Sequence, residues 1–306
     1  MLEEKVVIVA DERYPLNGIF TLPDESFWPC SAVVFVHGSG SSNMDEKIQK
    51  LTPFKDLAEG LAKLGIASIR YDKRSFAHGL KMVRSKEVIT VQQETVDDAV
   101  AAVKLLKKDT RIASENIYIL GHSMGGMLAP RIDLAADAKG LIIMAGSARN
   151  LHEIMLGQFE DMKANSNRLT RWILDKSTKK IEDTLTKLDS MSDEEAKKTS
   201  LGNGTTAYYF KEMMNYPTDE LLRNLEKPVL ILQGDADFQV SIEKDYKLYQ
   251  QICSGKENVT FKLYEGLNHA FVPYISKDIT KVKNEYNVER HIPEYVMQDI
   301  VEWIKK

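Results

Sequence analysis

The chain has 306 residues, of which 43% are hydrophobic and 28% charged, and its formal net charge is −4. These values are typical of a globular protein with one large domain or two smaller ones, and they give no reason to expect nucleic acid as a partner. The two cysteines, Cys30 and Cys253, lie far apart without the CxxC spacing of a zinc or dithiol site.

Two further features bear on where the chain is expected to act. The N-terminal sequence Met-Leu-Glu-Glu-Lys lacks the basic and apolar regions of a secretory signal peptide. No apolar run approaches the roughly 20 residues of a membrane span. We therefore expect a cytoplasmic protein with no membrane partner, and the oligomeric state stays open.

The first part of the chain alternates apolar runs typical of strands with a stripe of helical spacing. Its first two runs are short and separated by Asn17-Gly18, which predicts an antiparallel pair at a sheet edge. In chain order we predict strands over 5–10, 19–22 and 32–36, a helix over 54–64, a strand over 66–71 and a polar turn over 72–75.

The rest of the chain continues this alternation, with one long interruption. We predict a helix over 95–106, strands over 117–120 and 141–145, helices over 152–163, 169–188 and 193–198, strands over 228–233 and 259–264, and a closing helix over 294–303. Alternating strands and helices predict an α/β fold with a mostly parallel sheet covered on both faces. The interruption, which has no convincing strand, predicts a helical lid over 149–225 inserted into a core of 1–148 and 226–306.

The predicted lid carries more apolar side chains than exposed helices need. They either hold the lid to the core, as the apolar faces of added helices usually do, or line a substrate pocket. The sequence leaves both possibilities open for Leu169, Trp172, Ile173, Leu185, Leu188, Tyr208, Tyr209, Phe210, Met213 and Met214.

The segment Gly121-His122-Ser123-Met124-Gly125 is the most informative motif. A β-prone run precedes it and helix-forming residues follow, so a serine lies at the apex of a tight strand–turn–helix. The spacing Gly-x-Ser-x-Gly is that of the nucleophile elbow, where only residues without a Cβ clear the neighbouring strand and helix. The following helix dipole favours negative charge that develops at Ser123. A glycine-rich turn that contains a serine by chance is the alternative.

A nucleophilic serine needs a general base, and the chain has six histidines. His269 follows the predicted strand 259–264, at the edge where a parallel sheet presents side chains. His122 is adjacent to the serine, but neighbours across such a turn point apart. His152 lacks the second histidine of a metalloprotease helix. His269 is therefore the predicted base, with a plain surface-loop histidine as the alternative.

The base in turn needs an acid to orient it, and two aspartates follow the predicted strand 228–233. Asp235 and Asp237 are two residues apart, so their side chains leave an extended segment on the same face. Periodicity alone therefore does not choose between them. Asp237 differs in being farther past Gln233, where the loop can turn toward His269.

Together these motifs resemble those of α/β-hydrolase-fold serine esterases over nearly the whole chain outside 149–225. Serine, acid and histidine occur in the order that this family uses. The sequence around these motifs is similar to that of bacterial carboxylesterases and cinnamoyl esterases. The matching segments are His37-Gly38-Ser39-Gly40, the elbow, Gly234-Asp235-Ala236-Asp237 and Asn268-His269-Ala270-Phe271.

The resemblance implies a catalytic triad of Ser123, Asp237 and His269, since the second acid of the family's Gly-x-x-Asp pattern serves the triad. It also implies an oxyanion hole formed by the backbone N–H groups of Ser39 and Met124. No metal and no organic cofactor is implied. One departure is Ser75, where many relatives have glycine, and it affects the expected substrate preference rather than catalysis.

The function expected from this resemblance is hydrolysis of carboxylic esters, with small acyl or aryl (cinnamoyl-type) esters as small-molecule substrates. Thioesters, lactones and acyl-peptides use the same apparatus, and the fold alone does not choose among them. A ligand-binding protein with little turnover is a further alternative, although a pure binder has no need of the full set of three residues.

Overall fold

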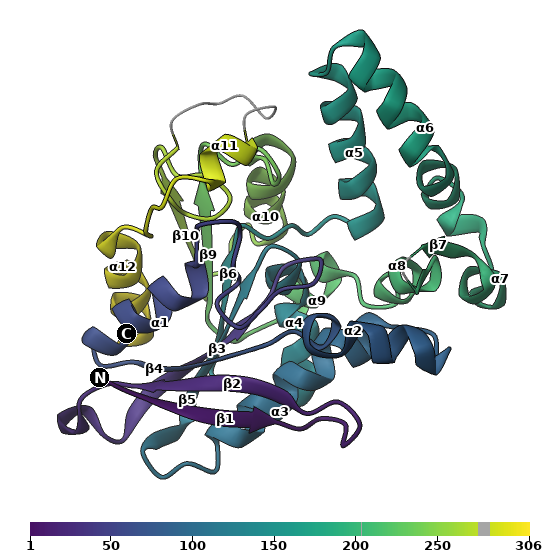
Figure 1. Cartoon of the computed structure of the whole chain (residues 1–306). Helices are drawn as coiled ribbons and strands as arrows, with labels where there is room; N and C mark the ends of the chain where they lie inside the picture. The colour runs from purple at the N-terminus through teal and green to yellow at the C-terminus, as the bar shows by residue number, and fades with distance from the viewer. Residues whose placement is uncertain (203, 275–281) are drawn as a thin grey trace.

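The computed structural model describes residues 1–202, 204–274 and 282–306. Its centre is an eight-stranded sheet in the order β1-β2-β4-β3-β5-β6-β9-β10 (Figure 1), in which the pairs β1–β2 and β2–β4 are antiparallel and the other pairs are parallel. The strands are β1 (Leu2–Ile8), β2 (Leu16–Leu22), β3 (Cys30–Val36), β4 (Ala67–Tyr71), β5 (Ile112–His122), β6 (Gly140–Met144), β9 (Val229–Gly234) and β10 (Val259–Tyr264). The predicted α/β fold with a mostly parallel sheet and an antiparallel edge pair is confirmed.

The sheet is buried on both faces because its central strands are continuous apolar runs. Every residue of β4, β6 and β9 is buried. The helices that cover the two faces are α1 (Pro53–Lys63) and α12 (Glu294–Ile304) on one side, and α3 (Asp97–Leu106), α4 (Met124–Ala136), α9 (Thr218–Asn224) and α10 (Lys247–Ile252) on the other (Figure 1). A short helix α11 (Val282–Tyr286) precedes α12.

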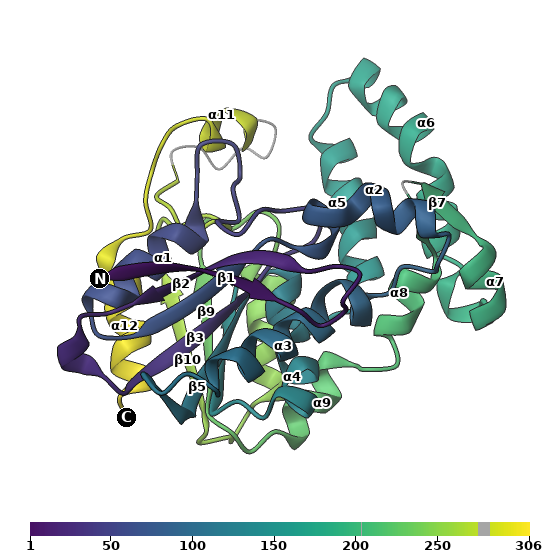
Figure 2. The same ribbon diagram turned by 60° about the horizontal axis from the view of Figure 1, so that its bottom comes forward.

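A helical insertion separates β6 from β9 and projects beyond the sheet (Figures 1 and 2). Its helices are α5 (Leu151–Ala164), α6 (Arg168–Leu185), α7 (Asp193–Lys198) and α8 (Tyr208–Met213). A short antiparallel pair, β7 (Ser200–Gly202) with β8 (Thr205–Thr206), also lies here, so the prediction of no strand in this part was wrong. Among the described residues, no helix is long and apolar enough to cross a membrane.

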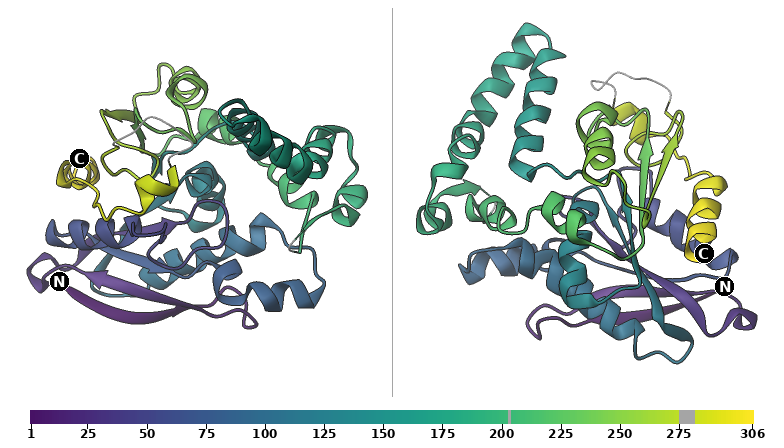
Figure 3. Two further views of the ribbon diagram at one scale, coloured as in Figure 1. Left: turned by 45° about the horizontal axis from the view of Figure 1, so that its top comes forward. Right: turned by 180° about the vertical axis from the view of Figure 1, so that it is seen from behind.

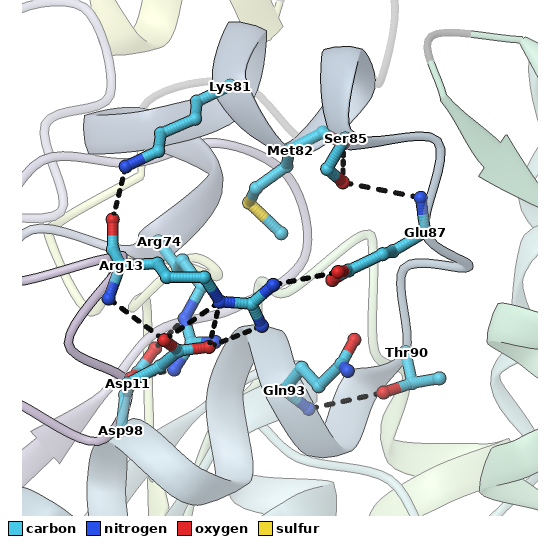
Figure 4. Close-up of polar contacts among 10 residues, drawn as sticks. All are labelled: Asp11, Arg13, Arg74, Lys81, Met82, Ser85, Glu87, Thr90, Gln93 and Asp98. Atoms are coloured by element: carbon cyan, nitrogen blue, oxygen red, sulfur yellow. Dashed lines mark hydrogen bonds and ion pairs between the residues drawn. The ribbon is translucent and has the colours of Figure 1, made fainter.

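The predicted polar turn over 72–75 is also wrong, because helix α2 (Arg74–Ser85) begins within it. Lys73 and Arg74 are each only 2% exposed. Arg74 donates from Nε to Oδ2 of Asp98 at 3.0 Å (Figure 4), which fixes the start of α2 to α3. Farther along α2, Nζ of Lys81 donates to the backbone carbonyl of Arg13 at 2.6 Å (Figure 4). Charges that look solvent-facing in sequence therefore anchor this helix.

Candidate active site

Ser123 lies at the apex of the turn between β5 and α4. Its backbone has φ 54° and ψ −118°, a left-handed conformation that L-residues rarely adopt. The Ser123 N–H donates to the carbonyl of Met144 on the neighbouring strand at 2.9 Å, which holds the turn in place. The residue is therefore strained and placed at the N-terminus of α4, as the elbow motif predicts.

The two elbow glycines are required by space. A Cβ on Gly121 would lie 2.1 Å from the carbonyl oxygen of Gly125, and a Cβ on Gly125 would lie 2.1 Å from the carbonyl oxygen of Val36. Both distances are far below van der Waals contact. The sequence thus folds into this turn because strand, turn and helix can approach closely only without side chains at these two positions.

His269 and Asp237 meet at the same edge of the sheet, past the ends of β10 and β9. His269 Nδ1–H donates to Asp237 Oδ2 at 2.8 Å, with His269 3% and Asp237 9% exposed. The other Asp237 oxygen accepts from the backbone N–H groups of Gln239 at 2.8 Å and Val240 at 3.0 Å. Since Nδ1 carries the proton in this arrangement, Nε2 is free to accept one.

The two candidate acids have different partners. Asp235 Oδ1 accepts from the backbone N–H of Gly266 at 2.6 Å and braces the loop after β10. Asp237 is the one that reaches the imidazole of His269. The loop turns between the two positions, so the geometry separates two residues that periodicity left equivalent.

Ser123 and His269 are brought to one edge of the sheet, but within the described part of the chain no hydrogen bond joins them. The His269 carbonyl instead accepts from His122 Nε2 at 2.8 Å, and the two imidazole centroids are 4.8 Å apart. Hydrogen bonds between a nucleophile and its base are often long without substrate and tighten when it binds. The arrangement is therefore compatible with a serine–base pair.

The His37-Gly38-Ser39 segment follows β3 and lies against the elbow. A Cβ built on Gly38 would be 3.2 Å from Cβ of Ser123. The Gly38 N–H donates to Glu46 Oε1 at 2.9 Å, and the Gly38 carbonyl accepts from Lys73 Nζ at 2.9 Å. Gly38 is thus held at both ends, and the next N–H in the chain is that of Ser39, a residue that lines the same cavity as Ser123.

His122 and Glu46 form a buried ion pair beneath the elbow, with Nδ1 and Oε2 2.9 Å apart. Burial alone would lower the pKa of His122, but the nearby Glu46 carboxylate outweighs it and raises that pKa. Burial would likewise raise the pKa of Glu46, and the charge on His122 lowers it instead. The pair ties the turn at Ser123 to the loop after β3.

A cavity of about 550 Å³ opens beside Ser123 between the sheet edge, α2 and the insertion. Ser39, Ser123 and Met124 are among the residues that line it. Its apolar walls include Met82 of α2, Met127 of α4, Leu151, Ile154 and Met155 of α5, and Phe210 of α8. A cavity with one strained serine and mostly apolar walls suits a small ligand that carries an apolar group.

The apolar residues of the insertion divide by role. Tyr209 and Phe210 line the cavity, which is one of the two possibilities that the sequence left open. Leu185 and Leu188 pack in a small core of the insertion, and Met213 packs against the main core. Leu169, Trp172 and Ile173 are more than half exposed, so they neither line the cavity nor hold the insertion down.

Sequence reasoning missed three buried charged residues around the site. Lys73 is 3.7 Å from Glu94, and Glu94 lines the cavity while accepting from the Tyr209 hydroxyl at 2.6 Å. Glu46 supports Gly38 and His122. Lysine and glutamate are usually exposed, and the partners of these three residues lie on other elements. No local sequence pattern therefore predicts that they are buried at the site.

Comparison with known families gives a match to the Hydrolase_4 model, described as serine aminopeptidase S33, over residues 29–273. Esterase EstD of Thermotoga maritima is 33% identical over 291 residues, which are 95% of this chain and 66% of that protein. The chain therefore spans about two thirds of the length of this curated relative.

Solved structures of esterases share the fold. Est1E from Butyrivibrio proteoclasticus superposes with a TM-score of 0.58 at 16% identity, covering 99% of both chains. The Pyrococcus furiosus esterase Pf2001 superposes with a TM-score of 0.57 at 16% identity, covering 100% of this chain and 91% of that one. At this identity the likeness shows the fold, that of the α/β hydrolases.

Proposed function

Because the chain belongs to the hydrolase family Hydrolase_4 and has the α/β-hydrolase fold, we propose that it cleaves carboxylic esters with Ser123 as nucleophile. One observation carries this proposal: a strained serine at the head of α4 borders a cavity of about 550 Å³, at the sheet edge where His269 and Asp237 pair at 2.8 Å. A serine that only filled a turn would need neither the strain nor the cavity.

The mechanism in this proposal assigns one role to each residue. Ser123 Oγ attacks the acyl carbon, and His269 Nε2 takes its proton and returns it to the leaving alcohol. Asp237 holds the imidazole tautomer and stabilises the imidazolium. The N–H groups of Ser39 and Met124 bind the oxyanion, and water then releases the acyl group from Ser123.

The cavity supports esters with a small acyl or aryl group as substrates. Its walls include methionine, leucine, isoleucine and aromatic side chains, which suit an apolar group and adapt to its shape. Est1E has also been solved with ferulic acid bound, and cinnamoyl-type esters belong to the substrates that we propose. In this proposal 149–225 acts as a lid on a core formed by 1–148 and 226–306.

The test is Ser123→Ala. We expect a folded protein whose hydrolysis of p-nitrophenyl acetate falls by roughly four or more orders of magnitude, because the nucleophile is gone. A fluorophosphonate probe should label the parent and not the variant. Labelling that persists at another serine, with activity retained, would refute the assignment. A matched control is Ser147→Ala, which also borders the cavity but keeps the nucleophile.

An aminopeptidase activity is the second candidate, since the matching family is described as serine aminopeptidase S33. Such an enzyme needs a carboxylate to bind the substrate's ammonium group. Among the described residues, Glu94 is the one carboxylate that lines the cavity, and Lys73 and Tyr209 already engage it. The lack of a free carboxylate in the described part of the cavity favours ester hydrolysis over aminopeptidase activity. Turnover of alanine p-nitroanilide that matches ester turnover would reverse the order of the two candidates.

A further inference from the structure

The inference concerns Lys73, a buried lysine in the first residues after β4, and it rests on the proposed oxyanion role of Ser39. Its side chain is 2% exposed, and a lysine that deep in a protein is rare unless it is paired. It touches two acceptors, the Gly38 carbonyl at 2.9 Å and the Glu94 carboxylate at 3.7 Å. The proposed reaction gives Lys73 no role of its own.

The position of the acceptor is the key fact. The Gly38 carbonyl and the Ser39 N–H belong to the same peptide group, at its two ends. The bond from Lys73 therefore pulls electron density towards the carbonyl oxygen of the same unit whose N–H we propose as an oxyanion donor. Hydrogen bonds polarise one another along such chains, and the effect is larger in a buried, low-dielectric site. The Ser39 N–H becomes a stronger donor.

The same contact fixes the orientation of that peptide plane. On its other side Gly38 donates to Glu46, a residue that also pairs with His122 under the nucleophile. A glycine with both its N–H and its carbonyl bound has little freedom left. The Ser39 N–H is therefore aimed before substrate arrives, which is how a preorganised oxyanion site lowers a barrier.

Glu94 balances the charge of Lys73 and links it to the insertion. Burial favours the neutral amine and lowers the pKa of Lys73, while Glu94 acts in the opposite direction. Glu94 is held in turn by the Tyr209 hydroxyl of α8 at 2.6 Å. The connection runs from the insertion through Tyr209, Glu94 and Lys73 to the peptide beside Ser123.

We propose that Lys73 is a positioning residue of the oxyanion hole, which orients and polarises the Gly38–Ser39 peptide so that the Ser39 N–H binds the tetrahedral intermediate more strongly than the substrate carbonyl. The alternative is a structural lysine that only satisfies a buried carbonyl. The two roles differ in what they affect: transition-state binding in the first, and folding stability in the second.

The test is Lys73→Met, which keeps most of the length of the side chain and removes its charge and donors. We expect kcat on p-nitrophenyl acetate to fall by roughly tenfold to thirtyfold, less than the loss of a whole oxyanion donor, with KM within about twofold. Phenylboronic acid forms a tetrahedral adduct on the serine. Its Ki should rise by the same factor, while the Ki of the product acetate stays unchanged.

The matched control is the double variant Arg74→Met/Asp98→Asn. It removes the neighbouring buried cation, at the first residue of α2, together with its partner, and it does not touch Gly38. We expect a lower melting temperature but unchanged kcat and boronate Ki. If this control shows the same kcat loss as Lys73→Met, or if Lys73→Met loses melting temperature while kcat and boronate Ki stay at parent values, the proposal is wrong.

Two further arms keep the result decisive. Should Lys73→Met fail to fold, Lys73→Gln replaces it: the shorter, uncharged amide should give the same parallel loss in kcat and boronate affinity, and parent values would overturn the proposal. Fluorophosphonate labelling separates the two levels of inference. A Lys73 variant that labels and turns over like the parent contradicts only the role of Lys73, whereas a parent that does not label at Ser123 contradicts the proposed function.

Discussion

The core and the insertion are built in opposite ways. In the core, each of the five residues of β6 is buried between two helical layers. In the insertion, α6 has 18 residues and buries only Thr178, Thr184 and Leu185, and the local core consists of five buried residues. Figure 3 shows α5 and α6 standing clear of the sheet when the molecule is seen from behind.

This difference assigns separate tasks to the two regions. The buried sheet fixes the backbone of Ser123, Asp237 and His269, because a close-packed interior resists displacement. The insertion contributes cavity wall from α5 and α8 while burying little else. We therefore expect core changes at the site to alter rate by orders of magnitude, and changes in the insertion to alter substrate preference by small factors.

The largest effect separates the two acids of the core. Asp237→Asn keeps the shape but can select the wrong histidine tautomer, so kcat on an activated ester should fall by about 10⁴, the size known for this change in serine proteases. Asp235→Asn should change kcat by less than roughly tenfold, because its partner is the Gly266 backbone. Both variants are measured on the same ester at the same pH, with folding checked by circular dichroism. A dead Asp235→Asn beside a normal Asp237→Asn would reverse the assignment.

A smaller effect is expected from the insertion. Met155→Ala replaces a side chain of the cavity wall with a smaller one and so enlarges the cavity. The ratio of kcat/KM on p-nitrophenyl octanoate to kcat/KM on p-nitrophenyl acetate should then rise by about fivefold, the effect expected of space for a few methylene groups. Trp172→Ala is the control, because that side chain is 55% exposed, and its ratio should stay unchanged. Equal shifts in both variants would show that the insertion acts by general loosening rather than through the cavity wall.

The smallest effects are pH slopes of opposite sign in the two regions. The pKa of His122 is raised above 6.5 by Glu46 in spite of burial, so its stabilising contribution is complete below pH 6.5 and is lost as pH rises through the raised value. The pKa of His152 in α5 is lowered by burial, although Asp189 opposes this, so stability there is lost as pH falls below 6.5.

Urea unfolding across about pH 5 to 9 measures both slopes, at about 1.4 kcal/mol for each unit of pKa shift. His122→Gln should remove the loss of stability on the alkaline side, and His152→Gln the loss on the acidic side. Each variant serves as the control for the other. If both variants change stability on the same side of the pH range, the charges beneath the elbow and in the insertion are not as the structure places them.

Most of the fold follows from patterns that a single segment contains. The predicted limits of β10 (259–264) and α7 (193–198) match the structure, because a strand bounded by loops and a helix with a serine cap are local features. Helix α2 was missed for the opposite reason. It begins with Arg74, whose partner Asp98 lies on α3, and three of its apolar residues, Phe76, Leu80 and Val83, face solvent rather than the core.

The candidate site shows the same division. Ser123 and His269 could be placed from sequence, since a strand, a turn and a helix or loop define each position. The choice of Asp237 over Asp235 rests on its greater distance from the strand and on the resemblance, because the turn of the loop between the two residues has no local signature. The support from Lys73, Glu94 and Glu46 could not be predicted, since each depends on partners that the fold brings from other elements.

The place where the insertion joins the core has a consequence for how such proteins diversify. Strands β6 and β9 are parallel neighbours, and a parallel pair always needs a crossover. Helix α9 packs on the same sheet face as α4 and supplies that crossover, so α5 to α8 are additions to a connection that is already complete. Gene segments for 151–213 could be exchanged between relatives without altering the register of the sheet. New substrate ranges would then arise by exchange of one inserted segment, through its two junctions, rather than by gradual change around Ser123.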